Sequence, residues 1–200
     1  LHGGPDSFET KLWQSQKNIT DELIAVTFTY NSPAQENEFP GNVTVEVTYS
    51  LDNANGWGVD YKAHSDVATL FNPTNHVYFN LDGDPSKSVG NHSLQIDAHQ
   101  FAPLDQHHLT TGLQQTVNDS TFDFRKPKKI AEVFTTDIPQ NQLVNGIDHP
   151  FFLDKKHNNQ VAAKLTSSDG LVAVNLTTSS PAVVIFTANF GTDFSLPMRR

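Results

Sequence analysis

The sequence predicts an all-β protein, built as an antiparallel sandwich or barrel, and three observations support this prediction. Several short segments alternate apolar and polar residues and are rich in β-branched and aromatic side chains. Clusters of Asn, Asp, Gly, Ser and Pro, which favour turns, separate these segments. No window of a dozen residues shows a clear 3.6-residue apolar period, so we expect little helix between the strands.

The expected elements follow from these patterns in order along the chain. The segments expected to form strands are residues 23–30, 42–49, 160–166, 171–177 and 182–190. The turn sequences beside them are Asn31-Ser32-Pro33, Phe39-Pro40-Gly41, Asp52-Asn53-Ala54-Asn55-Gly56 and Ser168-Asp169-Gly170. Residues 128–134 are expected to form a short helix at most. No repeat or linker divides the chain, so we expect residues 1–200 to form a single β-sandwich domain.

The composition excludes several classes of function. Of the 200 residues, 36% are hydrophobic and 10% aromatic, which is enough for a packed core and too many for a disordered chain. No apolar run approaches the roughly 18 residues of a membrane span. The net charge of -9 argues against nucleic acid or an anionic membrane as the main partner, because both require clustered Lys and Arg. The lack of cysteine excludes disulfides, thiolate metal sites and a cysteine nucleophile.

The chain begins Leu1-His2-Gly3-Gly4, with neither an initiator Met nor a charged or apolar leader. We therefore expect it to be part of a longer protein. The lack of cysteine and of a leader favours a cytoplasmic location.

Three polar positions are candidates for chemistry, and each also has a purely structural interpretation. His76 lies between an Asn-rich turn and an aromatic segment, where a histidine can simply be a hydrogen-bonded packing residue. Asp148 precedes His149 in a turn that its carboxylate can cap. His2 precedes two glycines, which allow close backbone approach to a ligand. The His107-His108 pair lacks the further spaced ligands of a zinc site, so we expect no metal there.

Six short motifs follow one another along the chain. They are Leu1-His2-Gly3-Gly4, Phe39-Pro40-Gly41-Asn42, Thr74-Asn75-His76-Val77-Tyr78-Phe79-Asn80-Leu81, Phe122-Asp123-Phe124-Arg125, Asp148-His149-Pro150-Phe151 and Thr187-Ala188-Asn189-Phe190. Together, in this order and spacing, they resemble the aldose 1-epimerase (galactose mutarotase) family over nearly the whole chain. The resemblance implies a large antiparallel β-sandwich, the galactose mutarotase-like supersandwich. Against that fold the chain is expected to be the central part, without N- and C-terminal strands.

The resemblance also implies an activity, the interconversion of the α and β anomers of free hexoses such as galactose and glucose. His76 matches the acid that protonates the ring oxygen, and the ordinary pKa of a histidine near 6.5 suits that role. His2 matches a histidine that hydrogen-bonds the sugar, and Asp148 matches a carboxylate that binds sugar hydroxyls. No metal or cofactor is implied, and the expected partner is a small-molecule hexose.

Some family positions are absent or changed in this sequence. The catalytic base of the family is a glutamate that we expect beyond residue 200, because no glutamate of the chain lies in a matching motif. An arginine and an asparagine that hold the sugar would precede Leu1. Val184 stands where many members carry a sugar-contacting glutamine. Trp57 and Phe151 are candidates for packing on the apolar face of the sugar ring.

Three other functions stay open. A non-catalytic carbohydrate-binding β-sandwich module would use His2, His76 and Asp148 for hydrogen bonding alone. A mutarotase for sugar phosphates would need a basic cluster, for which the sequence offers only Arg125, Lys126, Lys128 and Lys129. A β domain used for association is the last alternative, and no residue pattern supports it.

Overall fold

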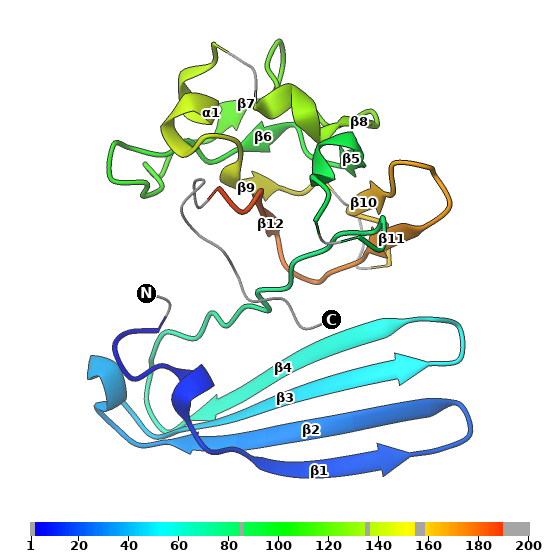
Figure 1. Ribbon diagram of the computed structural model, residues 1–200. Coiled ribbons are helices and arrows are strands. Elements are labelled where there is room, and N and C mark those ends of the chain that lie inside the picture. The colour runs from blue at the N-terminus through cyan, green and yellow to red at the C-terminus, as the bar shows by residue number, and fades with distance from the viewer. Residues whose placement is uncertain (1–2, 85, 135–136, 155–158, 190–200) are drawn as a thin grey trace. The chain divides into compact units, whose positions relative to one another are not determined.

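The structure is a computed structural model that describes residues 3–84, 86–134, 137–154 and 159–189 (Figure 1). Within these residues, three four-stranded sheets with antiparallel pairing account for the strands, and the helices are short. This arrangement confirms the all-β antiparallel class that the sequence predicts. The chain divides into two compact units, Leu1–Val77 and Tyr78–Arg200, and each is described by itself.

The first unit contains one sheet in which the strands follow one another in chain order. Its strands are β1 (Gln14–Ile19), β2 (Leu23–Ser32), β3 (Val43–Asp52) and β4 (Trp57–Ser65). Two short 3-10 helices, η1 (Phe8–Thr10) and η2 (Glu36–Glu38), flank β1 and β2. Residues 23–30 therefore form a strand as predicted, and the segment 42–49 does so from Val43 onward.

The two faces of this sheet differ in polarity. Residues that pair across strands lie on the same face. Tyr49 pairs with Val26 on one side and with Val59 on the other, so one face is apolar. Thr27 pairs with Thr48 on the opposite face, where their hydroxyl oxygens lie 2.8 Å apart. The apolar–polar alternation of the sequence reflects this division.

The second unit contains two sheets. One has the order β11-β10-β5-β8 and the other β12-β9-β6-β7. The strands are β5 (Ser93–Ile96), β6 (Gln100–Phe101), β7 (Gln115–Thr116), β8 (Lys128–Lys129), β9 (Asp148–Phe152), β10 (Ala163–Thr166), β11 (Ala173–Leu176) and β12 (Ala182–Phe186). The helices are η3 (Val89–Asn91), η4 (Ile130–Val133) and α1 (Pro139–Val144). Among the described residues, no helix has the length and apolar character that crossing a membrane requires.

The core of the second unit is shared by its two sheets, as in a sandwich. Ile96 and Ala163 enter it from one sheet, and Phe101 and Phe151 enter it from the other. The ring of Phe101 stacks on that of Phe122 with centroids 4.2 Å apart. Burial of each such ring contributes about 1.5–3 kcal/mol to stability. Phe151 is fully buried in this core, so the expectation that it packs on a sugar is wrong.

The other predicted segments form shorter elements than expected. The segments 160–166, 171–177 and 182–190 contain β10, β11 and β12. The short helix expected over residues 128–134 is the strand β8 followed by the single 3-10 turn η4. The helix α1 was not predicted. It begins at Pro139, which is favourable at a first helical position, and ends at Val144, followed by Asn145 in the left-handed conformation.

Candidate functional site

His76 lies in the first unit, in the segment of residues 68–80 that has no regular secondary structure. Its side chain is exposed. The residue before it ties this segment to the sheet, because the side-chain amide of Asn75 donates a hydrogen bond to the hydroxyl of Tyr49, over 3.3 Å. Tyr49 belongs to the apolar face of β3. Asn75 therefore has a structural role, while His76 is accessible to a ligand.

The end of the same motif lies in the second unit and is tied down there. The amide of Asn80 donates to the backbone oxygens of Asp84 and Lys87, at 3.2 and 3.0 Å. The backbone N–H of Leu81 donates to Nε2 of His92 over 2.9 Å, and His92 is fully buried. The residues after His76 in this motif thus include two with a clear structural function.

Asp148 begins β9 in the second unit, where it is half-buried. Alternate residues of a strand point to opposite faces. The burial pattern places His149 and Phe151 toward the core and places Asp148 and Pro150 on the other face. The carboxylate of Asp148 is therefore separated from the core and lies on a face where a ligand can approach.

His149, the neighbour of Asp148, has a structural role and is not an acid–base partner. His149 is fully buried, with its ring 4.8 Å from that of Phe122 and 5.6 Å from that of Phe101. Its Nδ1 accepts a hydrogen bond from the backbone N–H of Asp148 (3.1 Å), and its Nε2 lies 3.1 Å from Oε1 of Gln140. Burial lowers the pKa of His149 to about 4. His149 is therefore neutral near pH 7 and holds the backbone of Asp148.

The strand β12 brings two further residues to the face of Asp148. Phe186 pairs directly with Asp148, and Val184 pairs with Pro150. Val184, which replaces the usual glutamine, is 59% exposed, so this family position is on the expected face but lacks a hydrogen-bonding group. The ring of Phe186 meets that of Tyr78 at a centroid distance of 6.1 Å. Sequence reasoning missed Phe186 as the aromatic side chain beside Asp148, although it lies within the segment 182–190 that was expected to form a strand.

The other aromatic candidate, Trp57, is 48% exposed at the start of β4 in the first unit. Its side chain lies on the same face of the sheet as those of Leu51 and Ile24, because these three residues pair across neighbouring strands.

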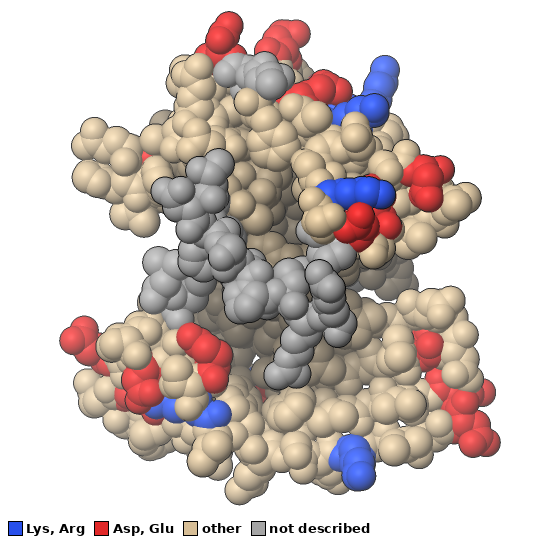
Figure 2. All heavy atoms as spheres, viewed as in Figure 1, with Lys and Arg blue, Asp and Glu red and all other residues tan. Residues whose placement is uncertain are grey.

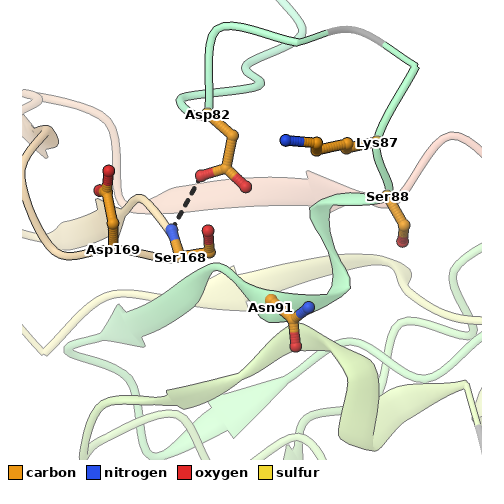
Figure 3. A pocket seen from close by; sticks show the side chains of 6 residues that line it. All are labelled: Asp82, Lys87, Ser88, Asn91, Ser168 and Asp169. Carbon is orange, nitrogen blue, oxygen red and sulfur yellow. Dashed lines mark hydrogen bonds between the residues drawn. The ribbon is translucent and has the colours of Figure 1, made fainter.

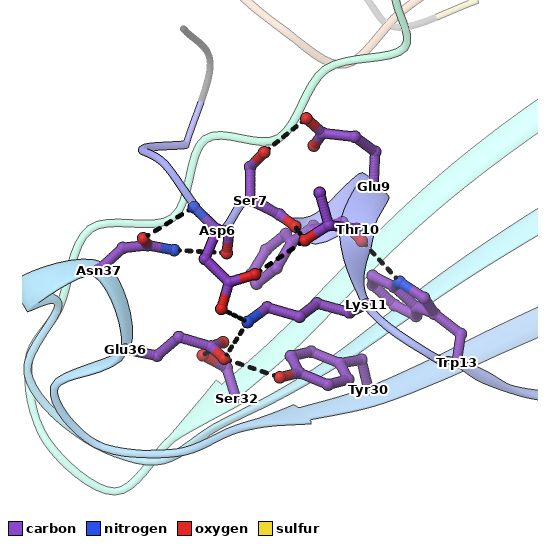
Figure 4. Close-up of polar contacts among 11 residues, drawn as sticks. Asp6, Ser7, Glu9, Thr10, Lys11, Trp13, Tyr30, Ser32, Glu36 and Asn37 are labelled. Atoms are coloured by element: carbon purple, nitrogen blue, oxygen red, sulfur yellow. Dashed lines mark hydrogen bonds and ion pairs between the residues drawn. The ribbon is translucent and has the colours of Figure 1, made fainter.

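His2 lies outside the described residues, which begin at the glycine that follows it. Gly3 and Gly4 have left-handed φ angles of +83° and +88°. A Cβ atom on Gly4 would approach the side chain of Asn37 to 3.0 Å, so this position favours glycine on both counts. Asn37 donates from Nδ2 to the backbone oxygen of Asp6 over 2.8 Å (Figure 4). These contacts fasten the backbone after His2 to the loop that follows β2.

A group of charged and hydroxyl side chains reinforces the same place, and we call Asp6, Lys11, Tyr30, Ser32 and Glu36 the Lys11 network (Figure 4). The Lys11 ammonium pairs with Asp6 and, at 2.7 Å, with Glu36. Glu36 also accepts from the hydroxyls of Tyr30 (2.8 Å) and Ser32 (2.6 Å). Burial alone would raise the pKa of Glu36, but the hydrogen bonds from Lys11, Ser32 and Tyr30 outweigh it and lower the pKa.

The motif Phe122-Asp123-Phe124-Arg125 is structural. Both phenylalanines are buried in the core. Arg125 donates to Asp123 through Nε at 2.8 Å and Nη2 at 2.6 Å, and these hydrogen bonds lower the pKa of Asp123 to about 2. Nζ of Lys128 lies 4.6 Å from the ring centroid of Phe124. Two members of the basic cluster that a sugar phosphate would need are therefore engaged within the protein.

A polar cleft of about 370 Å³ lies elsewhere in the second unit (Figure 3). It is lined by Asp82, Lys87, Ser88, Asn91, Ser168 and Asp169. Asp82 accepts a hydrogen bond from the backbone N–H of Ser168 over 2.9 Å, and this bond lowers its pKa. Neither His76 nor Asp148 is among the described residues that line the cleft.

On the face in Figure 2, Lys and Arg are scattered and acidic side chains occur in several places.

Comparison with known proteins adds to these observations. The sequence matches the family described as "Aldose 1-epimerase" over residues 1–198. Aldose 1-epimerase of Escherichia coli (strain K12) is 38% identical over 191 residues, which are 95% of this chain and 54% of that protein. Galactose mutarotase of Homo sapiens is 33% identical over 192 residues, which are 95% of this chain and 53% of that protein. The chain thus spans about half the length of these curated relatives.

The fold agrees with the sequence comparison. The crystal structure of galactose 1-epimerase from Lactobacillus acidophilus NCFM matches with a TM-score of 0.86 at 33% identity, over 98% of this chain and 56% of that chain. The family match covers almost every residue of the chain. The chain belongs to the aldose 1-epimerase family.

Proposed function

We propose that the protein interconverts the α and β anomers of free hexoses, with galactose and glucose as substrates. The observation that carries the proposal is the family match over residues 1–198, with identity of 38% to an aldose 1-epimerase. The accessible His76 and the outward-facing Asp148 are compatible with it, since both side chains can reach a ligand.

We assign His76 as the general acid. A base removes the proton from the anomeric hydroxyl while His76 protonates the ring oxygen, so the bond between C1 and the ring oxygen breaks. The open aldehyde rotates about its C1–C2 bond and closes again with the proton transfers reversed. Each positioned proton transfer typically accelerates such a reaction by on the order of 10²–10⁴-fold. A histidine suits this role because it gives and takes protons near neutral pH.

Asp148 and His2 are proposed to bind the hydroxyls of the sugar. A carboxylate makes stronger hydrogen bonds to hydroxyls than a neutral acceptor does. Phe186, which pairs with Asp148 across β9 and β12, offers a ring to the apolar face of the sugar. Glu36 is not proposed as the base, because its carboxylate accepts hydrogen bonds from Tyr30 and Ser32 and pairs with Lys11. The base is proposed to be a glutamate beyond residue 200, as the resemblance implies.

The proposal is tested with His76→Asn in the complete open reading frame that encodes this chain. Fresh α-galactose is followed by polarimetry, and the rate above the uncatalysed rate should fall by on the order of 10²-fold or more, because the acid is lost. His64→Asn is the matched control, since His64 is an exposed histidine on the polar face of β4 and its loss should leave the rate unchanged. An unchanged rate in His76→Asn would exclude His76 as the acid.

Calorimetric titration with galactose separates an enzyme from a binding module. A protein that binds galactose without accelerating anomerisation would be the non-catalytic carbohydrate-binding module instead. The cytoplasmic location and the organisation of residues 1–200 as one domain stay predictions of the sequence.

A further inference from the structure

The loop before Asp148 is packed so closely that it requires a glycine. Gly146 connects α1 to β9 with a φ of +149°. A Cβ atom at this position would lie 2.5 Å from Oγ1 of Thr187 and 2.7 Å from Oδ1 of Asn189. Two side chains from the segment that follows β12 thus approach the backbone that precedes Asp148. They belong to the motif Thr187-Ala188-Asn189-Phe190, for which the proposed function has no role.

These two side chains hold both backbone polar groups of Ile147. The N–H of Ile147 donates to Oγ1 of Thr187 over 2.9 Å. The oxygen of Ile147 accepts from Nδ2 of Asn189 and from the backbone N–H of Thr187, both at 3.0 Å. Thr187 in turn donates its hydroxyl proton to Oδ1 of Asn189 over 2.6 Å. This last bond fixes the direction of both side chains.

The opposite side of the loop is held by α1. The buried side-chain amide of Asn141 donates to the backbone oxygen of Gly146 over 2.8 Å. In return, the backbone N–H of Gly146 donates to the backbone oxygen of Asn141 over 2.9 Å. Thr121 donates to Oδ1 of Asn141, which turns the amide nitrogen toward Gly146. We call Asn141, Gly146, Ile147, Thr187 and Asn189 the Ile147 clamp.

Asp148 follows the clamp directly in the chain. Its own N–H donates to His149, so the backbone from Gly146 to Asp148 is held at each residue by a side chain. The contacts of Thr187 and Asn189 join residues about forty positions apart in the sequence. A clamp of this kind fixes the direction in which the carboxylate of Asp148 leaves the strand.

We propose that Thr187 and Asn189 are positioning residues for sugar binding, which act through Ile147 to orient Asp148. This inference rests on the proposed function, because it assigns the purpose of orienting Asp148 to the hydroxyls of a hexose. Small errors in the position of a binding group weaken its contacts strongly. Loss of the clamp therefore raises KM for the hexose more than it lowers kcat.

The test compares Thr187→Val, which keeps the shape but removes the hydroxyl, with Thr187→Ser, which keeps the hydroxyl. In polarimetry with α-galactose, Thr187→Val should raise KM roughly tenfold, equivalent to the loss of one good hydrogen bond. Thr187→Ser should restore KM to within about twofold of the wild type, because its hydroxyl can make the same bonds. Thr177→Val, at an exposed threonine of the same unit, is the unaffected control.

A double-mutant cycle with Asp148→Asn shows whether Thr187 acts through Asp148. In the Asp148→Asn background, Thr187→Val should change KM by less than about twofold, because the group to be oriented is gone. A fully additive effect would overturn the inference, as would a lower melting temperature with an unchanged KM in Thr187→Val. If the wild type neither anomerises nor binds galactose, the proposed function fails and the inference falls with it. If Asp148→Asn raises KM and Thr187→Val does not, the inference alone fails.

Discussion

The Lys11 network and the Ile147 clamp each hold a loop next to a proposed sugar-binding residue. The network does so with charged groups and the clamp with neutral ones. The Lys11 network follows His2 and consists of an ammonium, two carboxylates and two hydroxyls. The Ile147 clamp precedes Asp148 and consists of neutral amides, one hydroxyl and backbone groups. Each supplies hydrogen-bond partners to polar groups of its loop.

The difference predicts how each region responds to its surroundings. Attraction between charges near a surface is screened by salt and is lost when a carboxylate is protonated. Neutral hydrogen bonds depend on geometry and hardly on salt. The clamp should therefore fail when its shape is changed, and the network should fail when its charges are changed.

The largest effect is expected from a change in the shape of the clamp. Gly146→Ala places a Cβ atom 2.5 Å from Oγ1 of Thr187 and 3.0 Å from the ring of Phe134, on a backbone with positive φ. Overpacking and backbone strain together should lower the free energy of unfolding by about 2–4 kcal/mol. Urea denaturation measures this loss.

Gly170→Ala is the matched control for Gly146→Ala. Gly170 also has a positive φ, of +77°, but a Cβ atom on it would meet none of the described residues within 4 Å. Its free energy of unfolding should fall only by the cost of placing alanine in the left-handed conformation, about 1–2 kcal/mol. Equal losses in the two variants would show that the close packing at Gly146 contributes nothing.

The next largest effect is a pH dependence of the stability, and it comes from His149, the buried neighbour of Asp148. The pKa of His149 falls from 6.5 to about 4 on folding, because burial disfavours the charged ring. The unfolded chain therefore binds more protons between these values. The stability from the neutral ring is complete above pH 6.5 and is lost as the pH falls toward about 4, by about 3 kcal/mol in all.

Urea denaturation across this pH range, in the wild type and in His149→Asn, isolates the contribution of His149. The variant should show a flatter dependence between pH 6.5 and about 4, since no ring titrates at that position. The carboxylates of the Lys11 network have lowered pKa values, so their contribution is present above about pH 4.5 and is lost only below it. If the slope persisted in His149→Asn, another group would be responsible for it.

The sequence predicted the long strands β2 and β3 but missed the nine-residue β4 and the two-residue strands, and the failure at the two-residue strands has a physical reason. The strands β2 and β3 each have ten residues, long enough for alternation to be recognised. The strands β6, β7 and β8 have two residues each, so they carry no period and exist only through their partners. The strand β1 is exposed along its whole length and has only one apolar residue, Ile19, so its sequence shows no apolar–polar alternation.

The site shows the same limit. His76 and Asp148 became candidates through the order of the motifs, whereas their individual sequence contexts alone favoured packing or turn-capping roles. The strand period explains why Asp148 faces outward while His149 is buried beside Phe122. The function of Thr187 and Asn189 could not be predicted, because it depends on contacts with Ile147, some forty residues away.

The smallest effect is expected from the charges of the Lys11 network. Glu36→Gln removes the negative charge that pairs with Lys11 and replaces one of the oxygens that accept from Tyr30, Ser32 and Lys11. The free energy of unfolding should fall by about 1 kcal/mol at low salt, as for an ion pair partly screened by solvent. Glu22→Gln, at an exposed glutamate of the same unit, should change it by less than about 0.5 kcal/mol.

The salt dependence of this loss separates the two regions directly. In urea denaturation at low and high salt, the loss from Glu36→Gln should shrink as salt rises, because salt already weakens the attraction in the wild type. The loss from Thr187→Val should be the same at both salt concentrations, since the hydroxyl and the backbone groups it contacts carry no net charge. A loss from Glu36→Gln that did not vary with salt would mean that the network acts through its hydrogen-bond geometry, as the clamp does.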